Sequence, residues 1–288
     1  MSQKEIDDVT GVETTGHEWD GVKELNKPLP RWWLWTFYAT VVYAIVIWVL
    51  EPSWPTLSGY TKGVLGNSDR AEVQKRIAAA AAAQAGNLEK ISNTELAQIS
   101  KDQDLLQFAM GAAKTPFAEN CAPCHGRGGQ GGIGYPNLAD DAWIWGGDIE
   151  AIHKTILHGI RWTHEDTRIS DMPRYGIDEL LQSNEINDVA EYVLSLGGGA
   201  TDKEAAKRGQ TTFAEQCATC HGEDGKGNRE LGAPNLTDKT WLYGDDKNAI
   251  LTSIRTGRGG KMPNWDDRLD PVILKSLAVY VHGLGGGE

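Results

Sequence analysis

The sequence predicts a mainly α-helical protein, with one N-terminal transmembrane helix followed by two similar helical domains in series. Three observations lead to this fold class. An apolar run without charges extends from Trp32 to Leu50, and a long segment that begins at Phe117 occurs twice with the same motifs. Neither copy shows the alternating apolar pattern that is typical of strands. A chain of 288 residues has room for one to three domains.

The apolar run is long enough to cross a membrane. Its 19 residues reach about 28 Å as a helix, which is close to the hydrocarbon thickness of a bilayer. Trp32, Trp33 and Trp35 crowd one end, and Trp48 and Trp54 lie near the other, as expected for interfacial aromatic belts. A buried core helix would be shorter, and a signal peptide would begin earlier and end in small residues. We therefore expect residues 32–50 to be a permanent transmembrane anchor.

The charges around this anchor predict its orientation. Lys23, Lys27 and Arg31 precede it, whereas Lys62 is the only basic residue in the next 15 or so positions. Because basic residues stay on the cytoplasmic side, residues 1–31 should form a cytoplasmic segment. The rest of the chain should then lie outside the cytoplasm.

Residues 51–104 are expected to form a helical linker. The stretch "EPSWPTLSGYTKG" is rich in turn residues, and six consecutive alanines follow shortly afterwards. They predict a helix from Ser68 that ends at Gly86 or Asn87. A second helix should begin near Thr94. We interpret this stretch as a spacer.

An internal repeat divides the remainder into two predicted domains, residues 105–199 and 200–288. "FAENCAPCHG" recurs as "FAEQCATCHG", "PNLADDAWIWG" as "PNLTDKTWLYG", and "EYVLSLGGG" as "VYVHGLGGG". Copies of about 90 residues are whole domains and not solenoid units. The copies differ mainly in one loop, where "GIRWTHEDTRISDM" is eight residues longer than "GRGGKM". The longer loop, residues 160–171, is a candidate contact for a partner subunit.

The four cysteines all belong to two Cys-x-x-Cys-His motifs, which are Cys121, Cys124 and His125, and Cys217, Cys220 and His221. A disulfide within a motif would close a very short loop and stabilise little. A zinc site would need its two cysteine pairs much closer than the 92 residues that separate them, and a thioredoxin-like pair needs a βαβ setting. Covalent haem attachment explains the histidine, because two thiols add to the porphyrin vinyl groups and the next residue binds the iron. The motifs predict two covalently bound haem c groups, which are attached outside the cytoplasm.

A second axial ligand is expected from methionine. Met172 and Met262 occupy matching positions in "DMPRYG" and "KMPNWD". The rival ligands, none of which recurs in both copies, are His153, His158, His164 and His282. In the default pairing, Met172 binds the iron at the first motif and Met262 the iron at the second. A crossed pairing, in which each methionine binds the iron of the other copy, stays open. Two closed iron sites would suit electron transfer and not catalysis.

Further contacts with the haem groups are predicted from the repeat. A ligating imidazole usually donates its other N–H to a carbonyl, which Pro136 and Pro234 can offer. The indole groups of Trp143 and Trp241 either donate to a haem propionate or pack in the core. Core packing is expected for four aromatic residues, since Tyr192 and Tyr280 on the last helices should pack against Phe117 and Phe213 on the first.

These motifs carry a family resemblance. The PNL, Met-Pro and closing aromatic helix of each copy look like the small class I cytochrome c domain. "GHEWDGVKELNKPLPRWWLW", followed by one span and two haem motifs, resembles the CcoP/FixP subunit family of cbb3-type cytochrome c oxidases over essentially the full length. The resemblance implies a single-pass protein of the bacterial inner membrane, with a cytoplasmic N-terminus and periplasmic haem domains.

The resemblance also implies a function. Such a subunit is not catalytic by itself and takes electrons from a periplasmic cytochrome c or a quinol–cytochrome c reductase. It passes them to a monohaem cytochrome c subunit and on to a haem–copper subunit, which reduces oxygen and pumps protons in aerobic respiration. The net charge of −12 disfavours nucleic acid as a partner and suits a basic electron donor.

Two other classes of protein share parts of this pattern. A free-standing, membrane-anchored dihaem cytochrome c that serves another periplasmic reductase would carry the same motifs. A dihaem peroxidase or gas sensor would need one open iron, which the two matching methionines disfavour.

Overall fold

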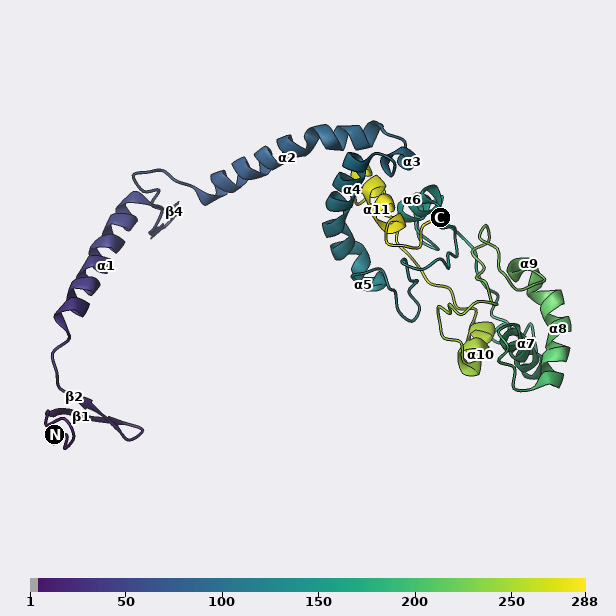
Figure 1. Ribbon diagram of the computed structural model, residues 1–288, viewed down its shortest axis with the longest axis horizontal. Helices are drawn as coiled ribbons and strands as arrows, with labels where there is room; N and C mark the ends of the chain where they lie inside the picture. Colours follow the sequence, from purple (N-terminus) through teal and green to yellow (C-terminus); the bar gives the residue numbers. More distant parts are fainter. Residues whose placement is uncertain (1–4) are drawn as a thin grey trace. The chain divides into compact units, whose positions relative to one another are not determined.

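The computed structural model describes residues 5–288, which form one unit up to Ala81 and a second unit from Ala82 to Glu288 (Figure 1). The first unit contains β1 (Thr14–Trp19), β2 (Val22–Leu25), α1 (Arg31–Leu50), β3 (Pro55–Thr56), β4 (Gly59–Tyr60) and the start of α2 (Asp69–Asn93). The second contains α3 (Leu96–Ile99), α4 (Gln103–Pro116), the π-helical turn η1 (Phe117–Cys121), α5 (Ala122–His125), α6 (Ile149–His158), α7 (Ser183–Leu196), α8 (Lys203–Gln216), α9 (Ala218–His221), α10 (Lys247–Thr256) and α11 (Pro271–His282). The predicted mainly helical fold is confirmed.

A β-hairpin, which was not among the elements expected from the sequence, precedes the apolar helix. Trp19 pairs with Val22 across a two-residue turn of Asp20 and Gly21. The φ angles of these two residues are 48° and 85°. Positive φ at both positions is typical of a type I′ turn, for which Asp-Gly is a favoured pair. The dipeptide was therefore a readable signal for the β1–β2 hairpin.

Helix α1 coincides with the predicted apolar run. None of its residues is buried within the protein, and large apolar side chains are exposed on all its sides. Trp48 and Trp54 pack edge to face at its C-terminal end, with ring centroids 4.8 Å apart. A helix that is apolar all round and uncovered by protein requires an apolar solvent. Among the described residues, α1 is the one helix long and apolar enough to cross a membrane.

Helix α2 extends to Asn93, so the predicted end at Gly86 or Asn87 is wrong. A glycine inside a helix costs about 1 kcal/mol relative to alanine, and two features of the second unit offset this cost. Ile91 is fully buried. The ammonium group of Lys275, from α11, donates to two carbonyl oxygens in the last turn of α2 and to that of Thr94 just after it, over 2.8 to 3.3 Å. A cation at this position satisfies carbonyls that the helix leaves free.

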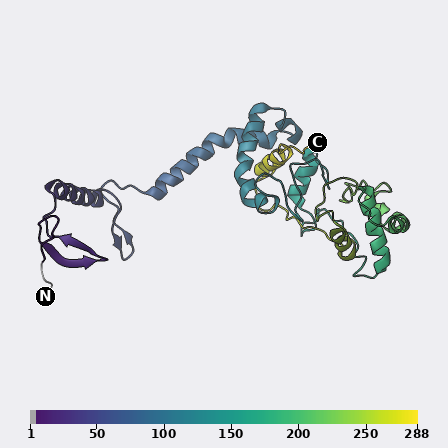
Figure 2. The same ribbon diagram turned by 60° about the horizontal axis from the view of Figure 1, so that its bottom comes forward.

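The second unit has two hydrophobic cores, and each combines parts of both repeat copies. Core A consists of buried side chains of α3, α4, α6 and α11, together with Ile91 and Phe117. Core B consists of buried side chains of α7, α8 and α10, together with Tyr175 and Leu181. Figures 1 and 2 show α11 alongside α4, and α7 alongside α8. The predicted linker therefore contributes to core A through Ile91 and α3.

The last helix of each copy packs against the first helix of the other copy. The ring of Phe117 lies 5.0 Å from that of Tyr280, and the ring of Phe213 lies 5.0 Å from that of Tyr192. All four predicted core aromatics thus pack in the cores, but each pair joins opposite copies. The backbones of α7 and α8 cross so closely that a Cβ on Gly209 would lie 2.0 Å from a carbonyl oxygen of α7.

A buried carboxylate ties the helices of core B together. Glu191 is fully buried, whereas core A has the apolar Val279 at the corresponding position. It accepts hydrogen bonds from the N–H groups of Thr201 and Asp202 at the start of α8, and it pairs with Lys247 of α10 at 2.7 Å. Burial raises the pKa of Glu191, but these bonds outweigh burial and lower that pKa to about 2.

We expect the substitution Glu191→Gln to destabilise the protein by roughly 1–3 kcal/mol near neutral pH. The folded pKa of about 2 lies below the ordinary value of 4.5. The carboxylate therefore stabilises the fold above about pH 4.5, and this contribution disappears as the pH falls towards 2. Denaturant unfolding near pH 7 and near pH 3 measures the effect. Glu215→Gln, on the exposed face of α8, is the matched control; an equal pH dependence in the native protein and in Glu191→Gln would contradict the assignment.

Candidate functional site

Both Cys-x-x-Cys-His motifs fold as a short helical turn that follows the first helix of their copy. In the first copy, Pro116 ends α4 and the chain widens into the π turn η1 before α5. In the second copy, α8 leads directly into α9. Pro116 has no N–H to donate to the helix, and Thr212 takes its place in the second copy. A π turn follows Pro116 in the first copy, whereas an α-helix continues past Thr212 in the second.

The two thiols of each motif are free and lie in different environments. Cys121 is half-buried against core A and Cys217 against core B, whereas Cys124 and Cys220 are exposed. Burial raises the pKa of Cys121 and Cys217 to about 11, with a smaller effect from the neighbouring thiol. Each motif thus has one thiol at the edge of a core and one exposed thiol. This arrangement is suitable for two covalent bonds to a group that lies over the surface of the core.

The two motif histidines each contact the predicted proline carbonyl. The Nδ1 atom of His125 lies 2.9 Å from the carbonyl oxygen of Pro136, and that of His221 lies 3.1 Å from that of Pro234. A carbonyl can only accept, so Nδ1 carries the proton and Nε2 keeps a lone pair. Burial lowers the pKa of both imidazoles, against a smaller upward effect of the carbonyl. Each ring is therefore neutral and can bind a metal through Nε2.

A second hydrogen bond closes each loop between histidine and proline. The N–H of Gly131 donates to the carbonyl of His125, and that of Gly227 to the carbonyl of His221, at 2.7 Å in both cases. Both glycines have positive φ, and a Cβ on either would lie 2.5 or 2.4 Å from the carbonyl oxygen of the residue before the proline. Only glycine fits at these two positions, because a side chain would collide with the backbone before the proline. The loop therefore holds the proline carbonyl in place, and this carbonyl sets the direction of the imidazole.

The two predicted methionines pack against the cores of the opposite motifs. Met172 packs against core B, which carries Cys217. Met262 packs against core A, which carries Cys121, and its backbone exchanges two hydrogen bonds with Ile160, of 2.9 and 3.0 Å. Each methionine precedes the last helix of its copy, and these helices cross to the other core. The packing supports the crossed pairing and not the default one.

Close backbone contacts hold both methionine segments. Gly159 follows α6, and a Cβ on it would lie 2.4 Å from the carbonyl oxygen of Met262. Gly257 follows α10, and a Cβ on it would lie 2.3 Å from the carbonyl oxygen of Met172. Since α6 belongs to core A and α10 to core B, each methionine is positioned by the core against which it packs.

The edges of the two cores fit a flat apolar group with a metal at its centre. The half-buried apolar residues at corresponding positions are Cys121, Leu138, Trp143 and Met262 in core A, and Cys217, Leu236, Trp241 and Met172 in core B. The imidazole Nε2 atoms and the methionine sulfurs are the iron donors of a c-type haem, and the cysteine thiols are its points of attachment. The residues present therefore fit one such group at each core.

The two predicted tryptophans have backbone partners for their N–H groups. The indole of Trp143 donates to the carbonyl of Gly286. That of Trp241 donates to the carbonyl of Asp238 at 3.2 Å. Both rings also pack against their cores, as the packing interpretation expects. A role towards haem propionates stays a prediction.

A set of contacts that was not expected from the sequence joins the two cores. Trp145 lies against Gly232, where a Cβ would be 2.1 Å from the ring, and Tyr243 lies 3.4 Å from a Cβ on Gly134. The N–H of Gly134 also donates to the carbonyl of Leu242 at 2.7 Å. Both glycines lie two residues before the proline that binds a motif histidine. The repeated "WIWG" and "WLYG" were the available signal.

An arginine covers each of these aromatic rings. The guanidinium carbon of Arg168 lies 5.2 Å from the centre of the Trp145 ring, and that of Arg258 lies 4.4 Å from the centre of the Tyr243 ring. Each guanidinium also donates to a carbonyl of the preceding helix, α6 or α10. The two arginines are thus structural counterparts. Since Gly159 likewise corresponds to Gly257, the eight extra residues of the first copy are residues 160–167.

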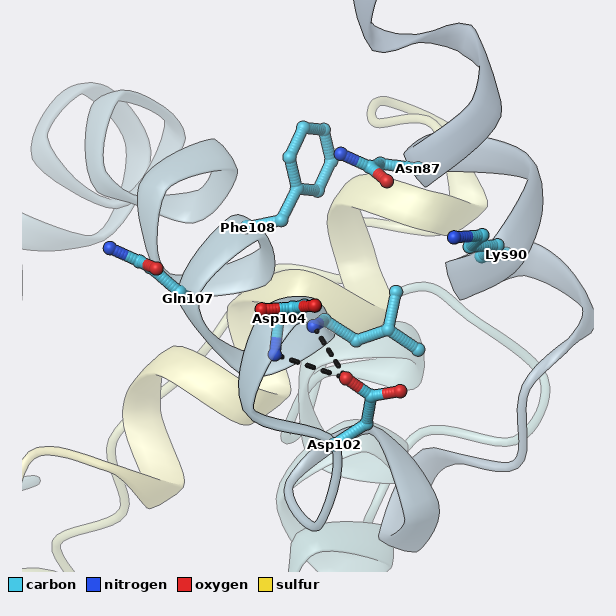
Figure 3. Close-up of a pocket in the computed structure, with 7 residues that line it drawn as sticks. Asn87, Lys90, Asp102, Asp104, Gln107 and Phe108 are labelled. Atoms are coloured by element: carbon cyan, nitrogen blue, oxygen red, sulfur yellow. Dashed lines mark hydrogen bonds between the residues drawn. The ribbon is translucent and has the colours of Figure 1, made fainter.

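A shallow hollow between α2 and α4 lacks any comparable donor set. It is lined by Asn87, Lys90, Asp102, Asp104, Leu105, Gln107 and Phe108 (Figure 3). The carboxylate of Asp102 accepts hydrogen bonds from the N–H groups of Asp104 and Leu105, at 3.0 and 3.1 Å. Capping of α4 explains these contacts, and we assign the hollow no functional role.

Comparison with known proteins relates this arrangement to a respiratory complex. Residues 11–58 match the family described as the N-terminal domain of cytochrome oxidase-cbb3, FixP; residues 111–197 match cytochrome c; and residues 204–281 match subunit III of the cbb3-type oxidase. The two cytochrome c domains imply that the chain binds haem c.

Similar full-length proteins carry the same description. The chain is 52% identical over 276 residues to the cbb3-type cytochrome c oxidase subunit CcoP of Cereibacter sphaeroides, with 96% of this chain and 95% of the relative covered. It is 51% identical over 284 residues to the subunit FixP of Azorhizobium caulinodans, with 98% and 96% covered. Subunit CcoP of Azospirillum brasilense is 50% identical over 295 residues and is covered completely.

Proposed function

This chain belongs to the CcoP/FixP family of cbb3-type cytochrome c oxidase subunits, and on that premise we propose that it is the dihaem subunit through which electrons enter the oxidase. As a subunit of that complex it is associated with the membrane and with other oxidase subunits. Electrons come from a periplasmic cytochrome c and pass to a monohaem cytochrome c subunit. They then reach the haem–copper subunit, where oxygen is reduced.

The observation that carries this proposal is the pair of corresponding donor sets at the edges of cores A and B. Haem c, when bound, supplies an iron that takes up and releases one electron. The thiols of each Cys-x-x-Cys pair hold the macrocycle by thioether bonds. His125 and His221 bind through Nε2, because the carbonyls of Pro136 and Pro234 hold the proton on Nδ1.

In the crossed pairing, methionine sulfur would complete the binding of each iron. Met262 serves the group attached at Cys121, and Met172 serves the group attached at Cys217. Their packing against cores A and B supports this assignment. Thioether ligation favours reduced iron and closes the coordination sphere, so these residues suit electron transfer and leave no site for a substrate. The chain itself contributes no catalytic residue.

The orientation of the chain follows from its charges and from its chemistry. The basic residues before α1 favour a cytoplasmic N-terminus, and covalent haem attachment takes place outside the cytoplasm. The whole chain has a net charge of −12, of which residues 1–51 carry −4, so the part after the membrane helix carries −8. Such a surface attracts a basic cytochrome c and speeds their association at low salt.

Substitution of one methionine at a time tests the crossed pairing. In a chain that keeps only the first motif, through Cys217→Ser and Cys220→Ser, Met262→Ala should open the iron site and let the reduced protein bind carbon monoxide. Met172→Ala should leave the same chain unable to bind carbon monoxide. The reciprocal result is expected in a chain with Cys121→Ser and Cys124→Ser. The single-haem parents are the controls, and the opposite pattern would show that the default pairing is correct.

Removal of the chain from the purified oxidase tests the proposed function. We expect oxidation of a soluble cytochrome c to fall at least about tenfold, because the donor loses its entry site. Turnover with a small redox dye that reduces the remaining subunits directly should persist, and it controls for loss of the catalytic subunit. Unchanged cytochrome c oxidation would exclude the proposal. Migration of the chain alone on native gels of mildly solubilised membranes would favour a free-standing carrier.

A further inference from the structure

The eight residues that distinguish the first repeat copy, 160–167, bring a second group of possible metal ligands together. His164 and Asp166 lie in this inserted loop, and His158 is the last residue of α6. One ligand atom from each of the three side chains lies within 4.8 Å of the others. None of these residues belongs to the donor sets at the core edges, and the second copy has no counterpart of the inserted loop.

The hydrogen bonds of His164 show which of its two ring nitrogens has the lone pair that a metal ion needs. Its Nε2 atom lies 3.0 Å from a carboxylate oxygen of Asp266. Its Nδ1 atom accepts a hydrogen bond from the backbone N–H of Asp166 at 2.9 Å. The proton is therefore on Nε2, and Nδ1 holds a lone pair. A carboxylate that accepts from one nitrogen while the other faces a metal is the common support of a metal-binding histidine.

His158 supplies the second nitrogen. Its ring stacks on that of His164, with centroids 4.6 Å apart and planes 6° from parallel. Its Nδ1 atom is buried and has no hydrogen-bond partner. Buried polar atoms without a partner are rare in folded proteins, and an ion is one of the groups that can satisfy them. This orphaned nitrogen is independent of the geometry that brings the three side chains together.

We propose that His158, His164 and Asp166 bind a divalent transition-metal ion of the zinc class. Two imidazole nitrogens and one carboxylate oxygen are a usual protein donor set for zinc, whereas calcium and magnesium prefer oxygen ligands. Because the in-plane lone pairs of two parallel rings cannot meet at one ion, the ion turns the two imidazoles out of their stack. It also displaces the Asp166 N–H from Nδ1 of His164, and the three ligand atoms then lie about 2.0–2.2 Å from the ion. A water molecule completes the tetrahedral coordination.

The charge around this group favours a cation. The adjoining depression is lined by Thr163, His164, Glu165, Asn264, Asp266 and Asp267. The amide of Asn264 donates to carboxylate oxygens of Asp266 and Asp267, at 2.7 and 3.2 Å. The negative charges concentrate cations at the site. The ion links α6, the inserted loop and, through Asp266, the segment that follows Met262.

Zinc titration of the full-length, haem-loaded chain in detergent tests the proposal. The chain is purified without a polyhistidine tag and treated with a chelator, and zinc is then measured by calorimetry and by elemental analysis after dialysis. One zinc ion per chain is expected in the native protein. His164→Gln and Asp166→Asn should each lose this ion. Asp266→Asn should bind it about tenfold more weakly, because the support of His164 is lost.

Glu165→Gln is the matched control, since Glu165 lies in the same loop and carries a similar exposed carboxylate. It should keep the ion with an unchanged affinity. Binding of zinc by His164→Gln at the native affinity, or an equal loss in Glu165→Gln, would overturn the proposal. The visible spectrum of both haem groups should be the same in His164→Gln as in the native chain. A changed spectrum would mean that His164 serves a haem iron, and the zinc site would then be excluded whatever the fate of the proposed oxidase function.

Discussion

The exchange of last helices between the two repeat copies is the constraint on which the rest of the second unit depends. Helix α7 buries its apolar face on α8, and α11 buries its face on α4. A helix that is apolar along one stripe must cover that stripe with another element. Neither copy can therefore complete a core from its own residues, and the chain from Ala82 onward folds as one unit in spite of its internal repeat.

The same exchange divides the donor sets into a local part and a distant part. The contacts between histidine and proline carbonyl span only 11 and 13 residues, and the glycine-rich loops between them fix the imidazole without help from the other copy. The methionines depend on long-range packing, since each reaches its core with the helix that follows it. Contacts such as Trp145 on Gly232 then connect the loop of one core to the aromatic segment of the other. The geometry of both sites is thus coupled through the interface between the copies.

The two copies differ in sequence at places where one of them makes a polar contact that the other lacks. Glu191 clamps α8 and α10 in core B, whereas Val279 fills the same place in core A. Core A is instead joined to the end of α2 by Lys275. The inserted loop, residues 160–167, likewise belongs to the first copy alone and brings His164 beside Asp266. A near-symmetric repeat has in this way acquired different supports at its two cores.

The sequence by itself was enough to predict the membrane helix, the Cys-x-x-Cys-His motifs and the contacts between histidine and proline. Each of these features depends on residues that are close together along the chain. The hairpin turn at Asp20 and Gly21 could be read in the same way. The end of α2 could not, because the lysine that caps it lies 183 residues further along. Only the tertiary structure showed against which core each methionine packs. Motif spacing allows either arrangement, and the packing depends on where α7 and α11 bury their apolar faces.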